Sequence, residues 1–193
     1  MIKCAVEAGD QEVATIYATS RLFMLRVPSE CLPLQLAGEH SEVHIGTNDI
    51  SLTLFRRKNC SGPTVIHRRC VCATEGRTLC AVCALKLWID RFRGQHPAKL
   101  FRVSAKSFVK YMRRDAARCG LTGAALLGSH AWRRGMAQDI VNAGGSLATL
   151  LRAGQWRSSA FRVYLQQQAL DEDAVAKLVI DHSDDEALGE QTT

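Results

Sequence analysis

Residues 128–165 contain side chains that could carry out chemistry on a phosphate group. His130 and Arg133 lie three positions apart, so on a helix they share one face. At the start of a helix, such a pair also gains backbone N–H groups and the positive end of the helix dipole, which favour an anion. The phenol of Tyr164 could attack a phosphodiester if cations and a proton acceptor surrounded the phosphate. A surface histidine–arginine pair and a half-buried core tyrosine are the alternative interpretations.

Hydrophobic periodicity predicts the elements that would position these side chains. We expect helices over residues 10–27, 80–94, 104–119, 130–143, 146–153 and 158–169, a helical turn within 29–36, and strands over 42–46, 50–57 and 64–69. Pro28 would end the first helix. The last two strands flank the segment KNCSGP, which indicates a hairpin. The predicted fold class is α+β, mainly helical, with a small three-stranded antiparallel sheet.

Four of the eight cysteines occur as two close pairs in the segment CVCATEGRTLCAVC. They are Cys70, Cys72, Cys80 and Cys83. Four thiolates in two close pairs can surround a tetrahedral Zn²⁺ ion, so the segment predicts a structural zinc site, with four reduced cysteines in a loop as the alternative. The other four show no pairing pattern and are interpreted as reduced, buried side chains. They are Cys4, Cys31, Cys60 and Cys119.

Positive charge is concentrated in the first part of the chain. The net charge is +6, but residues 171–193 carry one basic and eight acidic side chains, so residues 1–170 carry +13. A body this basic favours a polyanionic partner such as nucleic acid, and a solvated basic surface is the alternative. No apolar run approaches the ~20 residues that cross a membrane, and the N-terminus shows no secretion signal.

The stretch GSHAWRRGMAQDIVNAGG…LLRAGQWRSSAFRVYL resembles the C-terminal part of the tyrosine recombinase (phage integrase) family. That family has His-x-x-Arg on a helix and a tyrosine ten residues after a later glycine, the spacing of Gly154 and Tyr164. Four segments are most similar to the eukaryotic transposon-derived branch of the family, which includes Crypton-like and DIRS-like elements. They are RVPSE, RRKN, the cysteine-rich segment and WRSSAFRVYL. The resemblance covers roughly residues 10–170.

This resemblance implies a domain organisation. Residues 1–170 would form a tyrosine-recombinase-like catalytic domain with a cysteine-rich insertion at 70–83, and residues 171–193 an acidic, partly disordered tail. Family members usually carry a separate helical DNA-binding domain, the core-binding domain, ahead of the catalytic one. We expect this core-binding domain to be absent here, so the chain would be a truncated or domesticated copy.

The resemblance also implies roles for individual residues. Arg26, His130, Arg133 and Trp156 would bind the scissile phosphate, Tyr164 would be the nucleophile, and Lys58 on the hairpin would protonate the leaving 5′ oxygen. Glu30 would hold Arg26 in place. The family also has a His or Trp about nine residues before the tyrosine. Two residues are candidates for this position, Gln155 and Trp156, and Trp156 is favoured. The expected contacts to the DNA backbone are Arg56, Arg57, Arg134 and Arg157.

The function implied is site-specific DNA recombination or integration through a 3′-phosphotyrosyl intermediate, with no cofactor for catalysis. The expected partner is double-stranded DNA, with self-association into a dimer or tetramer on it. We expect a nuclear location if the protein is eukaryotic, otherwise a cytoplasmic one, and neither secretion nor a membrane partner. Two alternatives stay open: a non-catalytic DNA-binding module with structural zinc, and a type IB topoisomerase-like enzyme.

Overall fold

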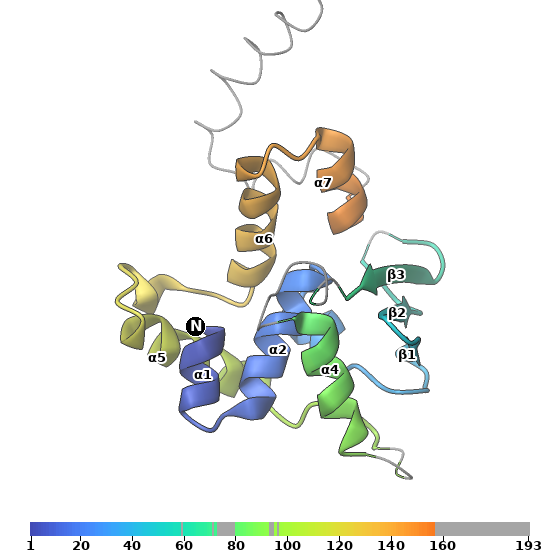
Figure 1. Cartoon of the computed structure of the whole chain (residues 1–193), viewed down its shortest axis with the longest axis horizontal. Coiled ribbons are helices and arrows are strands. Elements are labelled where there is room, and N and C mark those ends of the chain that lie inside the picture. The colour runs from blue at the N-terminus through green and yellow to red at the C-terminus, as the bar shows by residue number, and fades with distance from the viewer. Residues whose placement is uncertain (59, 71, 73–79, 93–94, 96, 157–193) are drawn as a thin grey trace, which may run out of the picture. The chain divides into compact units, whose positions relative to one another are not determined.

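The computed structural model describes residues 1–58, 60–70, 72, 80–92, 95 and 97–156 of the 193-residue chain (Figure 1). The chain divides into two compact units, residues 1–136 and residues 137–193. Over the described residues the protein is α+β, with helices and one three-stranded antiparallel sheet, which confirms the predicted class at this level. The predicted helix at 158–169 and the acidic tail at 171–193 lie outside the described residues.

The described elements follow one another in the predicted order, with two additions, α1 at the start and η2 between α5 and α6. The helices are α1 (Ile2–Glu7), α2 (Gln11–Leu22), α4 (Ala81–Asp90), α5 (Ala105–Arg118), α6 (Ala131–Asn142) and α7 (Leu147–Gly154). Shorter helical turns are the π-helical η1 (Val27–Cys31) and the 3-10 helical η2 (Ala124–Leu126). The strands are β1 (Ser41–Ile45), β2 (Asp49–Leu54) and β3 (Thr64–Arg69). Helix α1 was not predicted, because six residues are too few to show a helical period.

Helix α2 is the central helix of the first unit. Eight consecutive residues, Val13 to Ser20, are buried, and both α1 and α4 pack against this helix (Figure 1). A helix that is buried all round keeps water from its hydroxyl groups, so most of them pair within the protein. The buried Thr19 hydroxyl, which has no partner in the described part of the chain, is an exception. Thr15 donates to the carbonyl of Gln11 at 2.8 Å, and Ser20 to that of Ile16 at 2.7 Å. The backbone one turn earlier therefore satisfies these polar side chains.

Helix α2 ends at Leu22, five residues earlier than predicted. Met24 has a φ of 51°, in the left-handed region, so the backbone leaves the helix well before Pro28. The two residues after the helix cap, Met24 and Leu25, are both fully buried, and their burial offsets the cost of the left-handed conformation. Arg26 therefore has an extended backbone conformation. It directly precedes η1 and does not lie at the end of a helix.

The sheet has the order β1-β2-β3, and both strand pairs are antiparallel. The predicted hairpin is confirmed, since Leu54 pairs with Thr64 at the end nearest the connecting loop. Ile50, Leu52 and Leu54 alternate inward along β2. Regular pairing stops at Leu54, so the strand is shorter than predicted and Lys58 lies in the loop.

Two later helices begin directly after the serines that open the predicted ranges 104–119 and 146–153. Ser104 accepts a hydrogen bond from the backbone N–H of Ser107 at 3.1 Å at the start of α5. Ser146 accepts one from Thr149 at 3.2 Å at the start of α7. Each bond satisfies an N–H group that has no partner within its own helix. Among the helices of the described residues, none combines the length and the apolar character needed to cross a membrane.

Tyr17 on α2 is bonded through its hydroxyl to Asp115 on α5, at 3.0 Å and with both residues fully buried. Burial is the main reason that the pKa of Tyr17 is raised, so the phenol stays protonated and donates. We expect Tyr17→Phe to lower the free energy of unfolding by about 1.5–3 kcal/mol, because it removes a hydrogen bond to a charged acceptor. Urea denaturation measures this, with Tyr111→Phe on α5 as the control; equal losses in the two variants would contradict it.

One prediction about the cysteines is wrong. Cys4 and Cys119 form a disulfide, which joins α1 to the end of α5, whereas both were expected to be reduced. The two residues are 115 positions apart, so no local spacing pattern could pair them. The packing of α1 against α5 brings them together.

Candidate functional site

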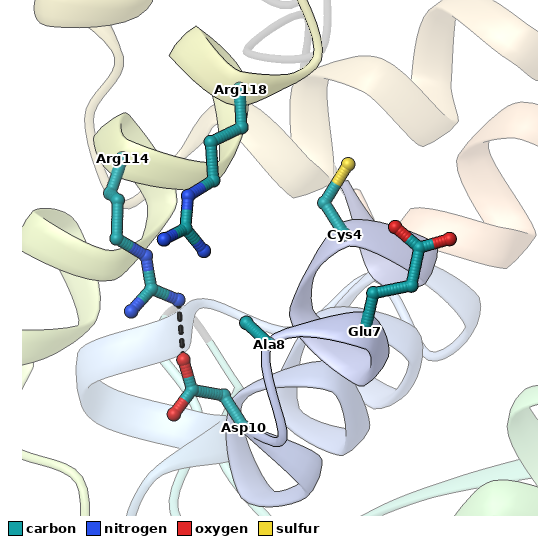
Figure 2. A pocket seen from close by; sticks show the side chains of 6 residues that line it. All are labelled: Cys4, Glu7, Ala8, Asp10, Arg114 and Arg118. Carbon is teal, nitrogen blue, oxygen red and sulfur yellow. Dashed lines mark hydrogen bonds and ion pairs between the residues drawn. The ribbon is translucent and has the colours of Figure 1, made fainter.

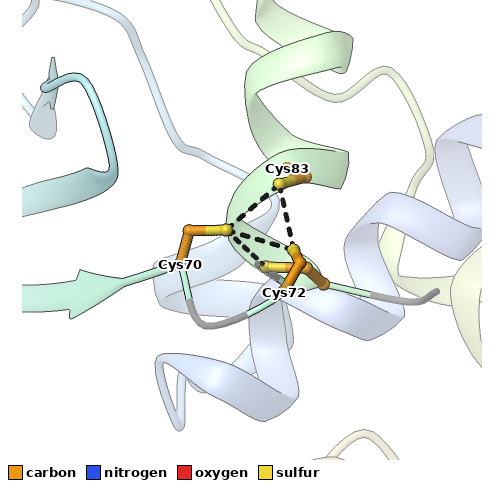
Figure 3. A group of neighbouring side chains, drawn as sticks. Cys70, Cys72 and Cys83 are labelled. Carbon is orange, nitrogen blue, oxygen red and sulfur yellow. Dashed lines mark hydrogen bonds between the residues drawn. The ribbon is translucent and has the colours of Figure 1, made fainter. Parts of the chain in front are cut away.

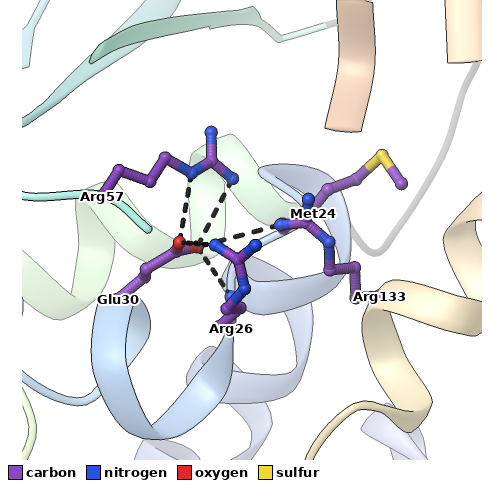
Figure 4. A network of polar contacts seen from close by, with 5 residues as sticks. All are labelled: Met24, Arg26, Glu30, Arg57 and Arg133. Atoms are coloured by element: carbon purple, nitrogen blue, oxygen red, sulfur yellow. Dashed lines mark hydrogen bonds and ion pairs between the residues drawn. The ribbon is translucent and has the colours of Figure 1, made fainter. Parts of the chain in front are cut away.

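Three arginines from separate segments meet at the carboxylate of Glu30 (Figure 4). Nη1 of Arg26 lies 2.5 Å from Oε1, and Nε of Arg57 lies 3.1 Å from the same oxygen. Nη1 of Arg133 lies 3.8 Å from Oε2 and donates to the carbonyl of Met24 at 2.6 Å. We call Arg26, Glu30, Arg57 and Arg133 the Glu30 cluster.

The π-helical turn η1 fixes the carboxylate beside Arg26. The Glu30 side chain accepts from the backbone N–H of Arg26 at 2.8 Å, and the Glu30 N–H donates to the Arg26 carbonyl at 2.8 Å. This reciprocal pair closes the turn, as a capping box does at the start of an α-helix. Arg57 arrives from the loop after β2, and Arg133 from the first turn of α6. Loops and helix starts therefore supply all the charged groups.

The charges of the Glu30 cluster do not balance. Burial alone would raise the pKa of Glu30, but the charges and hydrogen bonds of Arg57 and Arg26 outweigh it and hold the pKa below the usual range. The carboxylate is therefore ionised, and it faces three guanidinium groups, which are always protonated in proteins. The cluster carries a surplus of two positive charges in a mostly buried place. Such a surplus favours binding of an anion.

The other predicted residues of the first unit are exposed. His130 immediately precedes α6 and accepts at its carbonyl from the backbone of Arg134 at 3.0 Å, so it occupies the start of that helix as expected. The side chains of His130 and Arg134 are exposed, and so are those of Arg56 and Lys58 in the hairpin loop. These four polar groups are accessible to solvent.

Arg57 does not lie where a contact to the DNA backbone was expected. Its side chain is only 2% exposed, and it donates to Glu30 through Nε at 3.1 Å and Nη2 at 3.4 Å. Continuing the alternation of Leu52 and Leu54 would turn Arg56 inward instead. The regular strand ends at Leu54, so the alternation no longer applies and Arg57 faces inward. Strand periodicity therefore missed this member of the cluster.

Trp156 belongs to the second unit and follows α7. Its backbone N–H donates to the carbonyl of Leu151 at 3.0 Å, and the intervening Gln155 has a left-handed φ of 53°. The indole ring covers Gly154 so closely that a Cβ there would collide with it. The succession of Gly154, Gln155 and Trp156 therefore has a local packing reason. Two predicted residues, Arg157 and Tyr164, lie outside the described residues.

The four cysteines of the predicted metal site lie together in a four-cysteine centre (Figure 3). Their sulfur atoms are all within 4.8 Å of one another. Cys70 lies 3.1 Å from Cys72, 3.4 Å from Cys83 and 3.7 Å from Cys80, measured between sulfurs. Tetrahedral zinc–thiolate bonds of ~2.3 Å imply sulfur separations of about 3.8 Å. The centre therefore has the ligands and nearly the dimensions to bind a metal such as zinc.

The elements around the four-cysteine centre hold its ligands in place. Cys70 directly follows β3, and its N–H donates to the carbonyl of Asn48 at 2.6 Å; Cys80 caps the start of α4 and Cys83 lies in its first turn. Hydrogen bonding, chiefly from Cys72, lowers the pKa of the Cys70 thiol to about 7. The pKa of Cys72 is raised, mainly by its hydrogen bond to Cys70. One thiolate therefore forms readily, and a divalent cation would stabilise the others.

A second group of charges lines a cavity of about 480 Å³ beside α1 and α5 (Figure 2). Its walls include Glu7, Asp10, Arg114 and Arg118. The Arg114 guanidinium lies 2.5 Å from Asp10 and 2.8 Å from Asp115, so two carboxylates already neutralise it. This cavity lacks the surplus positive charge of the Glu30 cluster.

Comparison with known proteins gives no match, either to a protein-family model or to a curated protein. Inference about function therefore depends on the Glu30 cluster, on the four-cysteine centre and on the sequence pattern of residues 128–165.

Proposed function

We propose that this chain cleaves and rejoins double-stranded DNA through a 3′-phosphotyrosyl intermediate, in a tyrosine-recombinase-like catalytic fold. The observation that supports this proposal is the convergence of Arg26 and Arg133 on Glu30. The sequence resemblance implied that both arginines bind one phosphate and that Glu30 holds Arg26. The two arginines are far apart in the sequence, and the shared carboxylate brings their guanidinium groups close together.

In this proposal the cations stabilise the charge that develops on the scissile phosphate. Arg26 and Arg133, helped by His130 and Trp156, donate to its non-bridging oxygens, whose charge increases in the pentacoordinate transition state. The Tyr164 oxygen forms a bond to phosphorus while the bond to the 5′ oxygen breaks. His130 accepts the phenolic proton.

The leaving strand and the rejoining step use the remaining residues. Lys58 donates a proton to the departing 5′ oxygen, and a 5′-hydroxyl of another strand later reverses the attack. One phosphoester replaces another at each step, so the bond energy is kept in the protein–DNA link. The exposed cations Arg56 and Arg134 bind the DNA backbone in this proposal, and so does Arg157, which lies outside the described residues. Pairs or tetramers of the chain would assemble on the DNA to exchange strands.

We infer a structural role for zinc at the four-cysteine centre. Four thiolates fill a tetrahedral coordination sphere, which leaves no position for a substrate. The ion would join the end of β3 to the start of α4. Because β3 is one side of the hairpin, this link would also hold the loop that carries Arg57 and Lys58.

A covalent-trapping experiment tests the proposed reaction. Purified chain is incubated with nicked DNA duplexes of randomised sequence, in which the short fragment that carries the new 5′-hydroxyl diffuses away after cleavage. We expect a protein–DNA adduct that survives denaturing electrophoresis, because religation is prevented. Tyr164→Phe should abolish the adduct and retain DNA binding, since only the nucleophilic oxygen is removed.

Three results distinguish the alternatives. Tyr111→Phe, which removes a phenol from α5, is the matched control and should leave the adduct unchanged. If the wild-type chain binds DNA but forms no adduct on any duplex, the chain is a non-catalytic DNA-binding module. Relaxation of supercoiled plasmid without a partner site would instead indicate a type IB topoisomerase-like activity.

A further inference from the structure

The guanidinium of Arg57 has one side that its known partners do not use. Its Nε and Nη2 atoms donate to Glu30, whereas Nη1 is buried and has no hydrogen-bond partner within the described part of the chain. Figure 4 shows Nη1 turned away from the Glu30 carboxylate. A charged donor that is buried and unpaired is costly, so its persistence calls for an explanation.

The surroundings of this nitrogen suit an anion. The Glu30 cluster retains two surplus positive charges, and Arg57 contributes one of its three cations. The side chain of Arg26 is 19% exposed, whereas those of Arg57 and Arg133 are 2% and 1% exposed. Within the cluster, solvent therefore reaches the side chain of Arg26 most readily.

The number and directions of the donors favour a phosphate. Guanidinium groups form strong, charge-assisted hydrogen bonds to carboxylates and phosphates alike. A carboxylate offers two oxygens in one plane, whereas a phosphate offers oxygens in several directions. The three guanidinium groups approach Glu30 from three different segments (Figure 4). An anion bound among them would meet donors from several directions. A tetrahedral oxyanion matches that arrangement better than a planar one.

We propose that Nη1 of Arg57 is a ligand of the phosphate that Arg26 and Arg133 bind. This adds a third arginine to the phosphate contacts, from a residue that the family resemblance had placed only on the DNA backbone. Arg57 then has two functions: it neutralises Glu30 with one edge and binds phosphate with the other. That the phosphate belongs to DNA rests on the proposed function.

Titration calorimetry with inorganic phosphate, at constant ionic strength and on the full chain, tests this role. We expect the wild-type chain to bind one phosphate at the cluster. Arg57→Lys should weaken phosphate binding by about tenfold or more, because lysine keeps a cation beside Glu30 but lacks the second edge of the guanidinium. Arg102→Gln removes an exposed arginine elsewhere and should change the affinity by less than about twofold.

A second measurement uses the unaltered chain, so it holds even if Arg57→Lys does not fold. In ¹⁵N spectra of the arginine side chains, buried guanidinium protons exchange slowly and remain visible. We expect phosphate to shift the signals of a buried guanidinium group, whereas chloride at equal ionic strength does not. Unchanged buried signals, or equal phosphate affinity in wild type and Arg57→Lys, would overturn the proposed role of Arg57.

The two proposals fail in different ways. If Arg57→Lys loses phosphate affinity but the wild-type chain forms no adduct with nicked DNA, the phosphate site stands and strand cleavage falls. If the adduct forms and phosphate affinity is the same in both proteins, strand cleavage stands and the role of Arg57 falls.

Discussion

Replacing Glu30 with glutamine is expected to lower the free energy of unfolding by about 3–5 kcal/mol, the usual result of breaking a buried ion pair from one side. The substitution keeps the shape of the side chain but leaves three guanidinium groups without their shared negative charge. Two of those groups are almost completely buried, so water cannot replace the lost partner. Chemical denaturation monitored by circular dichroism measures the loss.

A matched control separates this effect from general sensitivity to charge. Glu42→Gln removes an exposed carboxylate from β1, and we expect it to change stability by less than about 0.5 kcal/mol. If the Glu30 and Glu42 variants lose similar amounts, the cluster does not depend on its carboxylate in the way described.

The difference in stability between the wild-type chain and Glu30→Gln should depend on pH. The pKa of Glu30 is lowered in the folded chain, so its contribution is complete above the ordinary glutamate pKa of about 4.3 and is lost as the pH falls through the folded pKa. The stability difference between wild type and Glu30→Gln should therefore narrow as the pH decreases from about 7 to below about 4. A constant difference over that range would mean that the pKa of Glu30 is not lowered in the folded chain.

Removing the metal from the four-cysteine centre is the second change with a large expected effect. At free zinc a thousandfold above its dissociation constant, a bound ion adds about 4 kcal/mol to stability. For a chain of this size, that corresponds to a decrease in melting temperature of about 8–16 °C when a chelator removes the ion. Elemental analysis should find one zinc per chain, and calorimetry with and without chelator gives the shift.

Cysteine variants test whether these thiols are the ligands. The double variant Cys80→Ser and Cys83→Ser should lose the zinc and the response to chelator, because two of the four thiolates are removed. Cys60→Ser changes a half-buried cysteine outside the centre and should keep both. All samples need the same reductant, since Cys4 and Cys119 form a disulfide. Zinc-free wild-type chain that melts at the same temperature with and without chelator would contradict the metal site.

Most predictions that depend on residues close together in the sequence are confirmed. The helix starts at Ser104 and Ser146 and the hairpin between β2 and β3 follow from neighbouring residues, and all three are confirmed. The pairing of Cys70 with Cys72 and of Cys80 with Cys83 was likewise readable, because close spacing limits where each thiol can lie. Such features depend on interactions between residues a few positions apart.

Errors arose where distant segments compete for the same core. The sequence pattern predicted that α2 extends to Val27. Burial of Met24 and Leu25 instead stabilises a helix that ends earlier, at Leu22. The disulfide of Cys4 with Cys119 depends on the packing of α1 against α5. In both cases a local pattern carried no information about the neighbour that decided the outcome.

The Glu30 cluster shows where the two sources of information divide. The amino-acid sequence by itself determined the pairing of Arg26 with Glu30, because the two residues lie four positions apart and one short turn joins them. Only the tertiary structure decided that Arg57 and Arg133 bind the same carboxylate, since they come from a hairpin loop and a later helix. A buried carboxylate can be neutralised by any cation that the fold brings within reach, and that reach is a property of packing across the whole first unit.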